Sequence, residues 1–131
     1  MNANGYNTRR ILIVEDELSI GKMCQIILTR EGYKVDIAID GIGAQDVIWE
    51  EEYNLCLVDM RMPRMNGKEF YQWLQKKYPR LSGRVIFTTG DVMDANIKTF
   101  IENSGRPFLP KPFTPNELKI IVKETVKKAG G

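Results

Sequence analysis

Carboxylates, hydroxyls and one lysine stand at or just beyond the ends of short apolar segments in this 131-residue sequence. In chain order these residues are Glu15 and Asp16, Asp59, Thr88 and Thr89, and Lys111. An aspartate can act as a nucleophile and accept a phosphoryl group as an acyl phosphate. Lysine and hydroxyl donors stabilise charge on the transferring group. These residue types favour phosphoryl transfer, in which the protein mainly positions groups and stabilises charge.

Glu15, Asp16 and Asp59 are three carboxylates that would disfavour one another's ionisation if they met without a cation. A hard divalent cation removes this cost. Mg²⁺ fits best because it takes oxygen ligands from a few carboxylates, from waters and from a phosphate oxygen. We therefore expect Mg²⁺ as a cofactor. The sequence contains no histidine, which argues against the usual serine and cysteine triads and against most zinc sites.

The hydrophobic pattern predicts the elements that must position these side chains. Apolar or β-rich runs predict strands at 10–14, 34–39, 55–58, 85–89 and 108–109. Helical spacing predicts helices at 17–31, 41–51, 67–78, 95–103 and 114–128. Strict alternation indicates an α/β fold with a parallel sheet and helices on both faces. Ligands of such sheets bind beyond the carboxyl ends of the strands, where the polar residues stand.

Two of the predicted helices have explicit starting signals. Thr114 is an N-cap residue followed by proline and, three positions later, by Glu117. Asn66 precedes the helix at 67–78 in the same way and is followed three positions later by Glu69.

Length and composition are those of one globular domain, with 43% hydrophobic and 27% charged residues. We expect a loose leader at 1–8, the domain at 9–128 and a short tail at 129–131. No apolar run approaches the roughly 18 residues of a membrane helix, and the first ten residues lack a signal-peptide pattern. We therefore expect a cytoplasmic protein without membrane contact.

Cys24 and Cys56 lie in apolar stretches and are expected to be buried thiols.

The net charge of +2 gives no indication of a nucleic-acid partner. Lys119, Lys123 and Lys127 lie opposite the apolar stripe of the last helix, which is typical of a solvated face. A Gly-Ile-Gly sequence at 41–43 follows a strand and opens a helix, as in dinucleotide binders, but Asp46 occupies the third glycine position. A P-loop sequence is absent, so nucleotide binding is disfavoured.

Four segments of the sequence resemble the receiver domains of bacterial two-component response regulators, in particular the chemotaxis regulators. They are 11–17 (ILIVEDE), 57–69 (LVDMRMPRMNGKE), 85–90 (VIFTTG) and 108–113 (FLPKPF). The run from Asp59 to Glu69 and the Lys-Pro-Phe sequence are the specific pieces. The resemblance implies one doubly wound five-stranded sheet of order 2-1-3-4-5, a flavodoxin-like (βα)5 fold.

The resemblance also implies a role for each site residue. Asp59 is the phosphoacceptor, and it binds Mg²⁺ together with Asp16, while Glu15 does so directly or through water. The backbone carbonyl of Arg61 is a further ligand, and Lys111 pairs with the phosphoryl oxygens. The conformational switch consists of Thr89 and Phe108. The Lys111–Pro112 bond is expected to be cis, as the family suggests, although few X–Pro bonds are.

Arg61 and Asp91 lie two positions after Asp59 and Thr89, respectively. We interpret them as tuning residues that form a salt bridge across the site and slow the loss of the phosphoryl group by restricting water. Two solvated charges are the alternative interpretation, because exposed ion pairs contribute little.

The resemblance implies that a sensor histidine kinase or a phosphotransfer protein is the phosphodonor. A fused kinase or output domain and a homodimer through the face of the helices at 95–103 and 114–128 remain open. The sequence is compatible with a free-standing regulator or with part of a hybrid histidine kinase. One rival is a pseudo-receiver that is never phosphorylated. An aspartate-nucleophile phosphatase of the haloacid dehalogenase type is disfavoured, because that family has a second aspartate where Arg61 stands.

Overall fold

Five parallel strands form a single sheet in the structure, a computed structural model that describes residues 8–90 and 94–130. The strands are β1 (Arg10–Val14), β2 (Lys34–Ala38), β3 (Leu55–Asp59), β4 (Val85–Thr89) and β5 (Phe108–Pro110). Their order is β2-β1-β3-β4-β5, so the predicted doubly wound α/β fold is confirmed. Most of the expected leader, the tuning residue Asp91 and the last tail residue lie outside the described residues.

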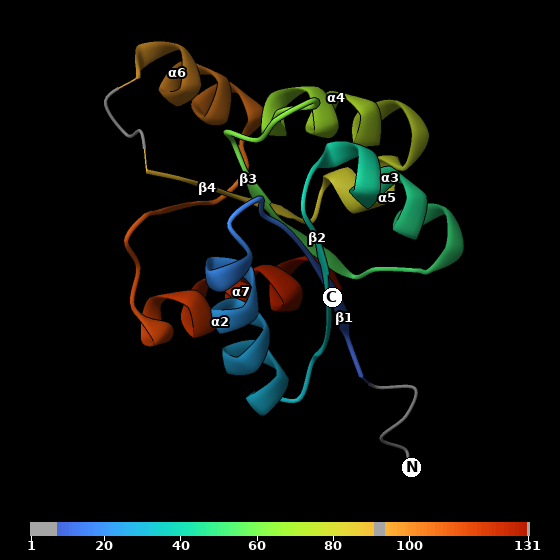
Figure 1. Cartoon of the computed structure of the whole chain (residues 1–131), viewed down its shortest axis with the longest axis vertical. Helices are drawn as coiled ribbons and strands as arrows, with labels where there is room; N and C mark the ends of the chain where they lie inside the picture. Colours follow the sequence, from blue (N-terminus) through green and yellow to red (C-terminus); the bar gives the residue numbers. More distant parts are fainter. Residues whose placement is uncertain (1–7, 91–93, 131) are drawn as a thin grey trace.

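Helices cover both faces of the sheet (Figure 1). They are α2 (Leu18–Arg30), α3 (Gly41–Glu50), α4 (Gly67–Lys77), α5 (Pro79–Ser82), α6 (Ala95–Ser104) and α7 (Pro115–Gly130). The short helix α5 was not predicted from the sequence, because the predicted helix at 67–78 ends just before Pro79. Proline also suits the first position of a helix, because its missing N–H has no intrahelical partner there.

The side chains of the central strands alternate between two apolar layers. Ile11 and Ile13 of β1 pack in the layer that contains α2 and α7. Leu12 and Val14 pack in the opposite layer, which contains α3, α4 and α6. All five residues of β3 and of β4 are buried. Burial on both faces explains why these strands lack hydrophobic alternation in the sequence.

Both predicted helix caps are present. The Asn66 side chain accepts a hydrogen bond from the Glu69 amide at 2.9 Å, and the Glu69 side chain accepts one from the Asn66 amide at 3.0 Å. Thr114 and Glu117 make the same reciprocal pair at 3.1 and 2.7 Å. The first cap fixes the start of α4 at Gly67, so that the seven residues 60–66 connect the end of β3 at Asp59 to this helix. Within the described part of the chain, no helix is long and apolar enough to cross a membrane.

Candidate functional site

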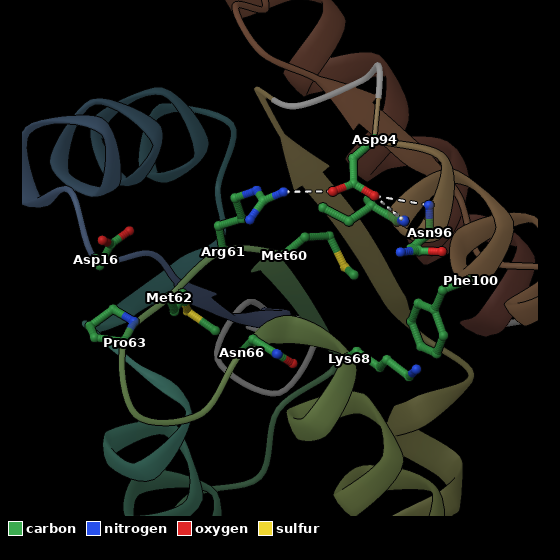
Figure 2. A pocket seen from close by; sticks show the side chains of 11 residues that line it. Asp16, Met60, Arg61, Met62, Pro63, Asn66, Lys68, Asp94, Asn96 and Phe100 are labelled. Atoms are coloured by element: carbon green, nitrogen blue, oxygen red, sulfur yellow. Dashed lines mark hydrogen bonds and ion pairs between the residues drawn. The ribbon is translucent and has the colours of Figure 1, made fainter.

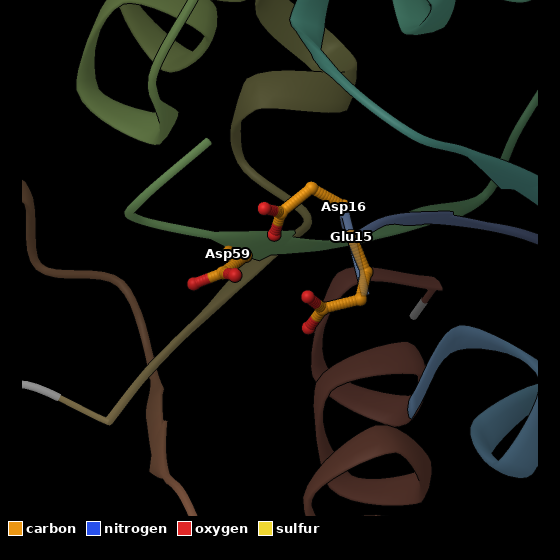
Figure 3. Close-up of side chains that lie close together, drawn as sticks. All are labelled: Glu15, Asp16 and Asp59. Carbon is orange, nitrogen blue, oxygen red and sulfur yellow. The ribbon is translucent and has the colours of Figure 1, made fainter. Parts of the chain in front are cut away.

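Three carboxylates meet where β1 and β3 end, as Figure 3 shows. Glu15 and Asp16 follow β1, and Asp59 is the last residue of β3. One carboxylate oxygen from each residue lies within 4.8 Å of the others. Glu15 and Asp59 are only 3% and 5% exposed, whereas Asp16 is exposed to solvent. The adjacent parallel strands β1 and β3 bring these residues together, because their carboxyl ends share one edge of the sheet.

Lys111 joins the two buried carboxylates. Its Nζ lies 2.7 Å from Oε1 of Glu15 and 3.1 Å from Oδ2 of Asp59. The backbone N–H of Lys111 donates to the carbonyl of Thr89 at 2.9 Å, which ties the lysine to the end of β4. The Lys111–Pro112 peptide bond is cis, as expected. The direct contact between Lys111 and Glu15 was not foreseen in the sequence.

The electrostatics of the site favour an additional cation. Burial raises the pKa of Glu15 to about 7, although the hydrogen bond from Lys111 opposes the rise. Burial alone would lower the pKa of Lys111, but its contacts with Glu15 and Asp59 raise it above the ordinary value. One ammonium group therefore faces three carboxyl groups. The donor set consists of oxygens and includes one exposed carboxylate, which fits a hydrated Mg²⁺ ion.

The loop between β3 and α4, residues 60–66, starts beside the carboxylates. The Arg61 amide N–H donates to Oδ1 of Asp59 at 3.3 Å. The Met60 amide donates to the Thr88 carbonyl at 2.9 Å, and the Gly67 amide donates back to the Met60 carbonyl at 3.1 Å. These bonds hold the Arg61 backbone next to the Asp59 carboxylate.

The Arg61 side chain reaches across a cleft to Asp94, as Figure 2 shows. Its Nη2 lies 2.8 Å from Oδ2 of Asp94. Oδ1 of Asp94 caps α6 by accepting from the amides of Asn96 and Ile97 at 2.9 and 3.1 Å. The cleft, about 470 Å³ in volume, extends from Asp16 to α6. The sequence interpretation missed Asp94, although an aspartate just before a segment with helical spacing is an N-cap signal.

Thr89 and Phe108 both line a second cavity, about 690 Å³ in volume, beside α6 and β5. Thr89 is 1% exposed, and Phe108 is partly buried against the core layer that contains α6. Thr89 pairs with Pro110 in the register of β4 and β5. The hydroxyl residue and the aromatic residue of the predicted switch, Thr89 and Phe108, therefore line the same cavity.

Gly67, the first residue of α4, lies against the backbone at the end of β3. A Cβ atom at Gly67 would stand 2.6 Å from the Asp59 carbonyl oxygen and 2.8 Å from the Met60 Cα. Neither atom belongs to a flexible side chain, so the backbone must shift. We expect Gly67→Ala to lower the free energy of unfolding by about 1–3 kcal/mol, measured in urea.

Gly43→Ala is the matched control for this substitution. A Cβ at Gly43 would lie 3.4 Å from Oδ1 of Asp40, which is ordinary van der Waals contact. Alanine is also the better helix former, so this variant should be at least as stable as the wild type. Equal stability of the two variants would contradict the close approach at Gly67.

Comparisons with known proteins point to one family. The model of the response regulator receiver domain matches residues 11–123. A CheY-like receiver domain protein from Methanospirillum hungatei is 31% identical, with a TM-score of 0.86 over 94% of this chain and 97% of that chain. The chemotaxis protein CheY4 of Vibrio cholerae is 25% identical, with a TM-score of 0.81 over 90% and 98% of the two chains. The receiver domain of a signal transduction histidine kinase from Syntrophus aciditrophicus is 27% identical, with a TM-score of 0.83 over 92% of each chain.

Proposed function

The chain belongs to the response regulator receiver domain family of two-component systems, and we propose that Asp59 is its phosphoacceptor. The phosphodonor is a phosphohistidine of a sensor histidine kinase or of a phosphotransfer protein. The observation that carries the proposal is the placement of Asp59 at the end of β3, within 4.8 Å of two further carboxylates and bonded to Lys111.

In the proposed reaction, a carboxylate oxygen of Asp59 attacks phosphorus, the bond between phosphorus and the imidazole nitrogen breaks, and the imidazole leaves. The product is an acyl phosphate. Asp16, Asp59 and Glu15 would hold Mg²⁺ together with the Arg61 carbonyl, and the bound ion supplies positive charge for the phosphoryl oxygens. Lys111, already held at the site by its contact with Glu15, supplies a second positive charge.

The proposed output is a change in the surface formed by α6, β5 and α7. The acyl phosphate attracts the Thr89 hydroxyl and Lys111 toward Asp59. Movement of Thr89 opens space in the adjoining cavity for Phe108, which already lines it. The phosphoryl group thereby shifts the population between two states for which it has different affinities. Phe108 has no hydroxyl, so the switch acts through packing rather than through a tyrosine hydrogen bond.

Hydrolysis of the acyl phosphate returns the domain to its first state, and the chain is a phosphoacceptor that supports its own phosphorylation and dephosphorylation. Arg61 restrains this hydrolysis. Its guanidinium extends toward Asp94 along the cleft that Asp16 also lines. In this position it limits the approach of water to Asp59. The domain works alone or fused to a kinase or output domain, and its partners read the altered surface.

The proposed chemistry is tested by incubating the wild-type protein with acetyl phosphate and Mg²⁺ and recording the intact mass. We expect one added phosphoryl group per chain when Mg²⁺ is present. No phosphoryl group should be added when the incubation contains a chelator in place of Mg²⁺. If no adduct forms, beryllofluoride binding is measured with Mg²⁺ present. Beryllofluoride binding would indicate a competent site with rapid hydrolysis. Its absence, in a folded protein that a histidine kinase also fails to label, would contradict the proposal and leave a pseudo-receiver.

A further inference from the structure

Arg64 ties the 60–66 loop to the start of α3. Its guanidinium donates from Nε at 2.9 Å and from Nη2 at 2.5 Å to the same oxygen, Oδ2 of Asp40. The other oxygen of Asp40 accepts from the Gly43 amide at 2.8 Å and caps α3. Asp40 is 3% exposed, whereas the Arg64 side chain is 61% exposed. One buried carboxylate therefore caps a helix and anchors the loop at the same time.

Two further features show that the loop has a defined conformation at this point. Arg64 has a φ of 66°, in the left-handed region that non-glycine residues rarely adopt. Met65 packs directly on Gly41, where an added Cβ would lie 2.8 Å from the Met65 side chain. The ion pair with Asp40 and the packing against Gly41 compensate for the unfavourable backbone conformation of Arg64.

The anchored loop carries Arg61, whose amide bonds to the Asp59 carboxylate. We propose that Arg64 is a positioning residue for the divalent-cation site, an inference that rests on the function proposed above. Bound to Asp40, it holds the 60–66 loop in the conformation in which Arg61 and Asp59 bind the cation. Arg64 makes no contact with the cation and acts through the loop.

Arg64→Gly separates positioning from simple electrostatics. Glycine adopts a φ of 66° without strain, so the substitution permits the native backbone but removes the guanidinium. Removal of a positive charge from the 60–66 loop would by itself strengthen binding of the Mg²⁺ cation. Loss of the ion pair between Arg64 and Asp40 should instead weaken Mg²⁺ binding. We expect the Mg²⁺ dissociation constant to rise about tenfold, as for loss of other groups that support metal ligands, measured by calorimetric titration.

Asp40→Asn tests the other partner of the ion pair. Asparagine is also a good N-cap residue, so the start of α3 is preserved, but the charge that binds Arg64 is lost. We expect a similar rise in the dissociation constant, and no further rise in the double variant, because both substitutions remove one interaction. Arg30→Ala removes an equal charge at the far end of α2 and should leave the constant unchanged.

The inference is overturned if folded Arg64→Gly binds Mg²⁺ as tightly as the wild type or more tightly. It is also overturned if the wild type binds no Mg²⁺, because the loop would then position no cation site. A wild type that binds Mg²⁺ but neither binds beryllofluoride nor takes a phosphoryl group from acetyl phosphate or a histidine kinase contradicts the proposed function alone. In that case, weaker Mg²⁺ binding by Arg64→Gly would still support the positioning role.

Discussion

Asp59→Asn is expected to take up no phosphoryl group under conditions in which the wild-type protein is labelled. The asparagine amide cannot form an acyl phosphate. It keeps only one of the two acceptor oxygens, Oδ1 and Oδ2 of Asp59, that accept from the Arg61 amide and from Lys111. Removal of a carboxylate from the donor set should also weaken Mg²⁺ binding by at least about tenfold, the lower end of the loss that supporting groups alone cause. Intact mass and calorimetric titration measure the two effects.

Asp46→Asn is the matched control, because Asp46 is exposed on α3 and outside the carboxylate cluster. This variant should be labelled and should bind Mg²⁺ as the wild type does. Asp16 is the exposed carboxylate of the cluster and is the alternative phosphoacceptor to consider. Peptide mapping of the labelled protein shows whether Asp16 or Asp59 carries the phosphoryl group. A phosphoryl group that persists in Asp59→Asn would assign the phosphoacceptor to another residue and contradict the proposed role of Asp59.

Lys111→Met is expected to lower the free energy of unfolding by about 3–5 kcal/mol at pH 8 without divalent cations, because a buried charge loses its partner. Methionine retains a long apolar stem but leaves the buried Glu15 and Asp59 carboxylates without the ammonium group 2.7 and 3.1 Å away. Mg²⁺ should restore more stability to the variant than to the wild type, since it supplies the missing positive charge. Urea unfolding with and without Mg²⁺ measures both effects.

The loss of stability in Lys111→Met should depend on pH. Glu15 already has a pKa raised from 4.5 to about 7, chiefly by burial, and loss of the lysine that opposes this rise increases it further. The folded protein then binds a proton more tightly than the unfolded chain does, so stability increases as the pH falls from above 7 toward 4.5. Unfolding curves across this range provide the measurement.

Lys22→Met is the control for the loss of one lysine, because Lys22 is exposed on α2. Its stability should stay close to that of the wild type at every pH in the series. A Lys111→Met protein as stable as Lys22→Met at pH 8 without Mg²⁺ would show that the contacts of Lys111 with the two carboxylates contribute no net stability.

The fold and the location of the candidate site follow from local patterns. The five apolar strand segments, the helical spacing between them and the polar residues at strand ends are all present in the sequence, and the parallel sheet confirms their arrangement. The caps at Asn66 and Thr114 were also predictable, because each depends on residues only three positions apart. Interactions within one turn of a helix can be inferred from residue type and spacing alone.

The tertiary structure decided which charged groups meet. Arg61 pairs with Asp94 across 33 residues, and Arg64 pairs with Asp40 across 24. The sequence interpretation did not include Asp94 and assigned no partner to Arg64. The salt bridge that it predicted between Arg61 and Asp91 stays a prediction, because Asp91 lies outside the described residues. A long arginine side chain can reach carboxylates in several loops at the same edge of the sheet. The spacing of residues in the sequence therefore does not predict which carboxylate it pairs with.

By itself, the sequence determined the alternation of strands and helices, the residues at the strand ends and the carboxylate chemistry that they allow. The tertiary structure alone decided that Lys111 bonds to Glu15 as well as to Asp59, and that Gly67 lies against the backbone of Asp59. Periodicity determines which face of an element is buried. Distances between side chains of separate elements depend on how the layers pack and on where each loop is anchored.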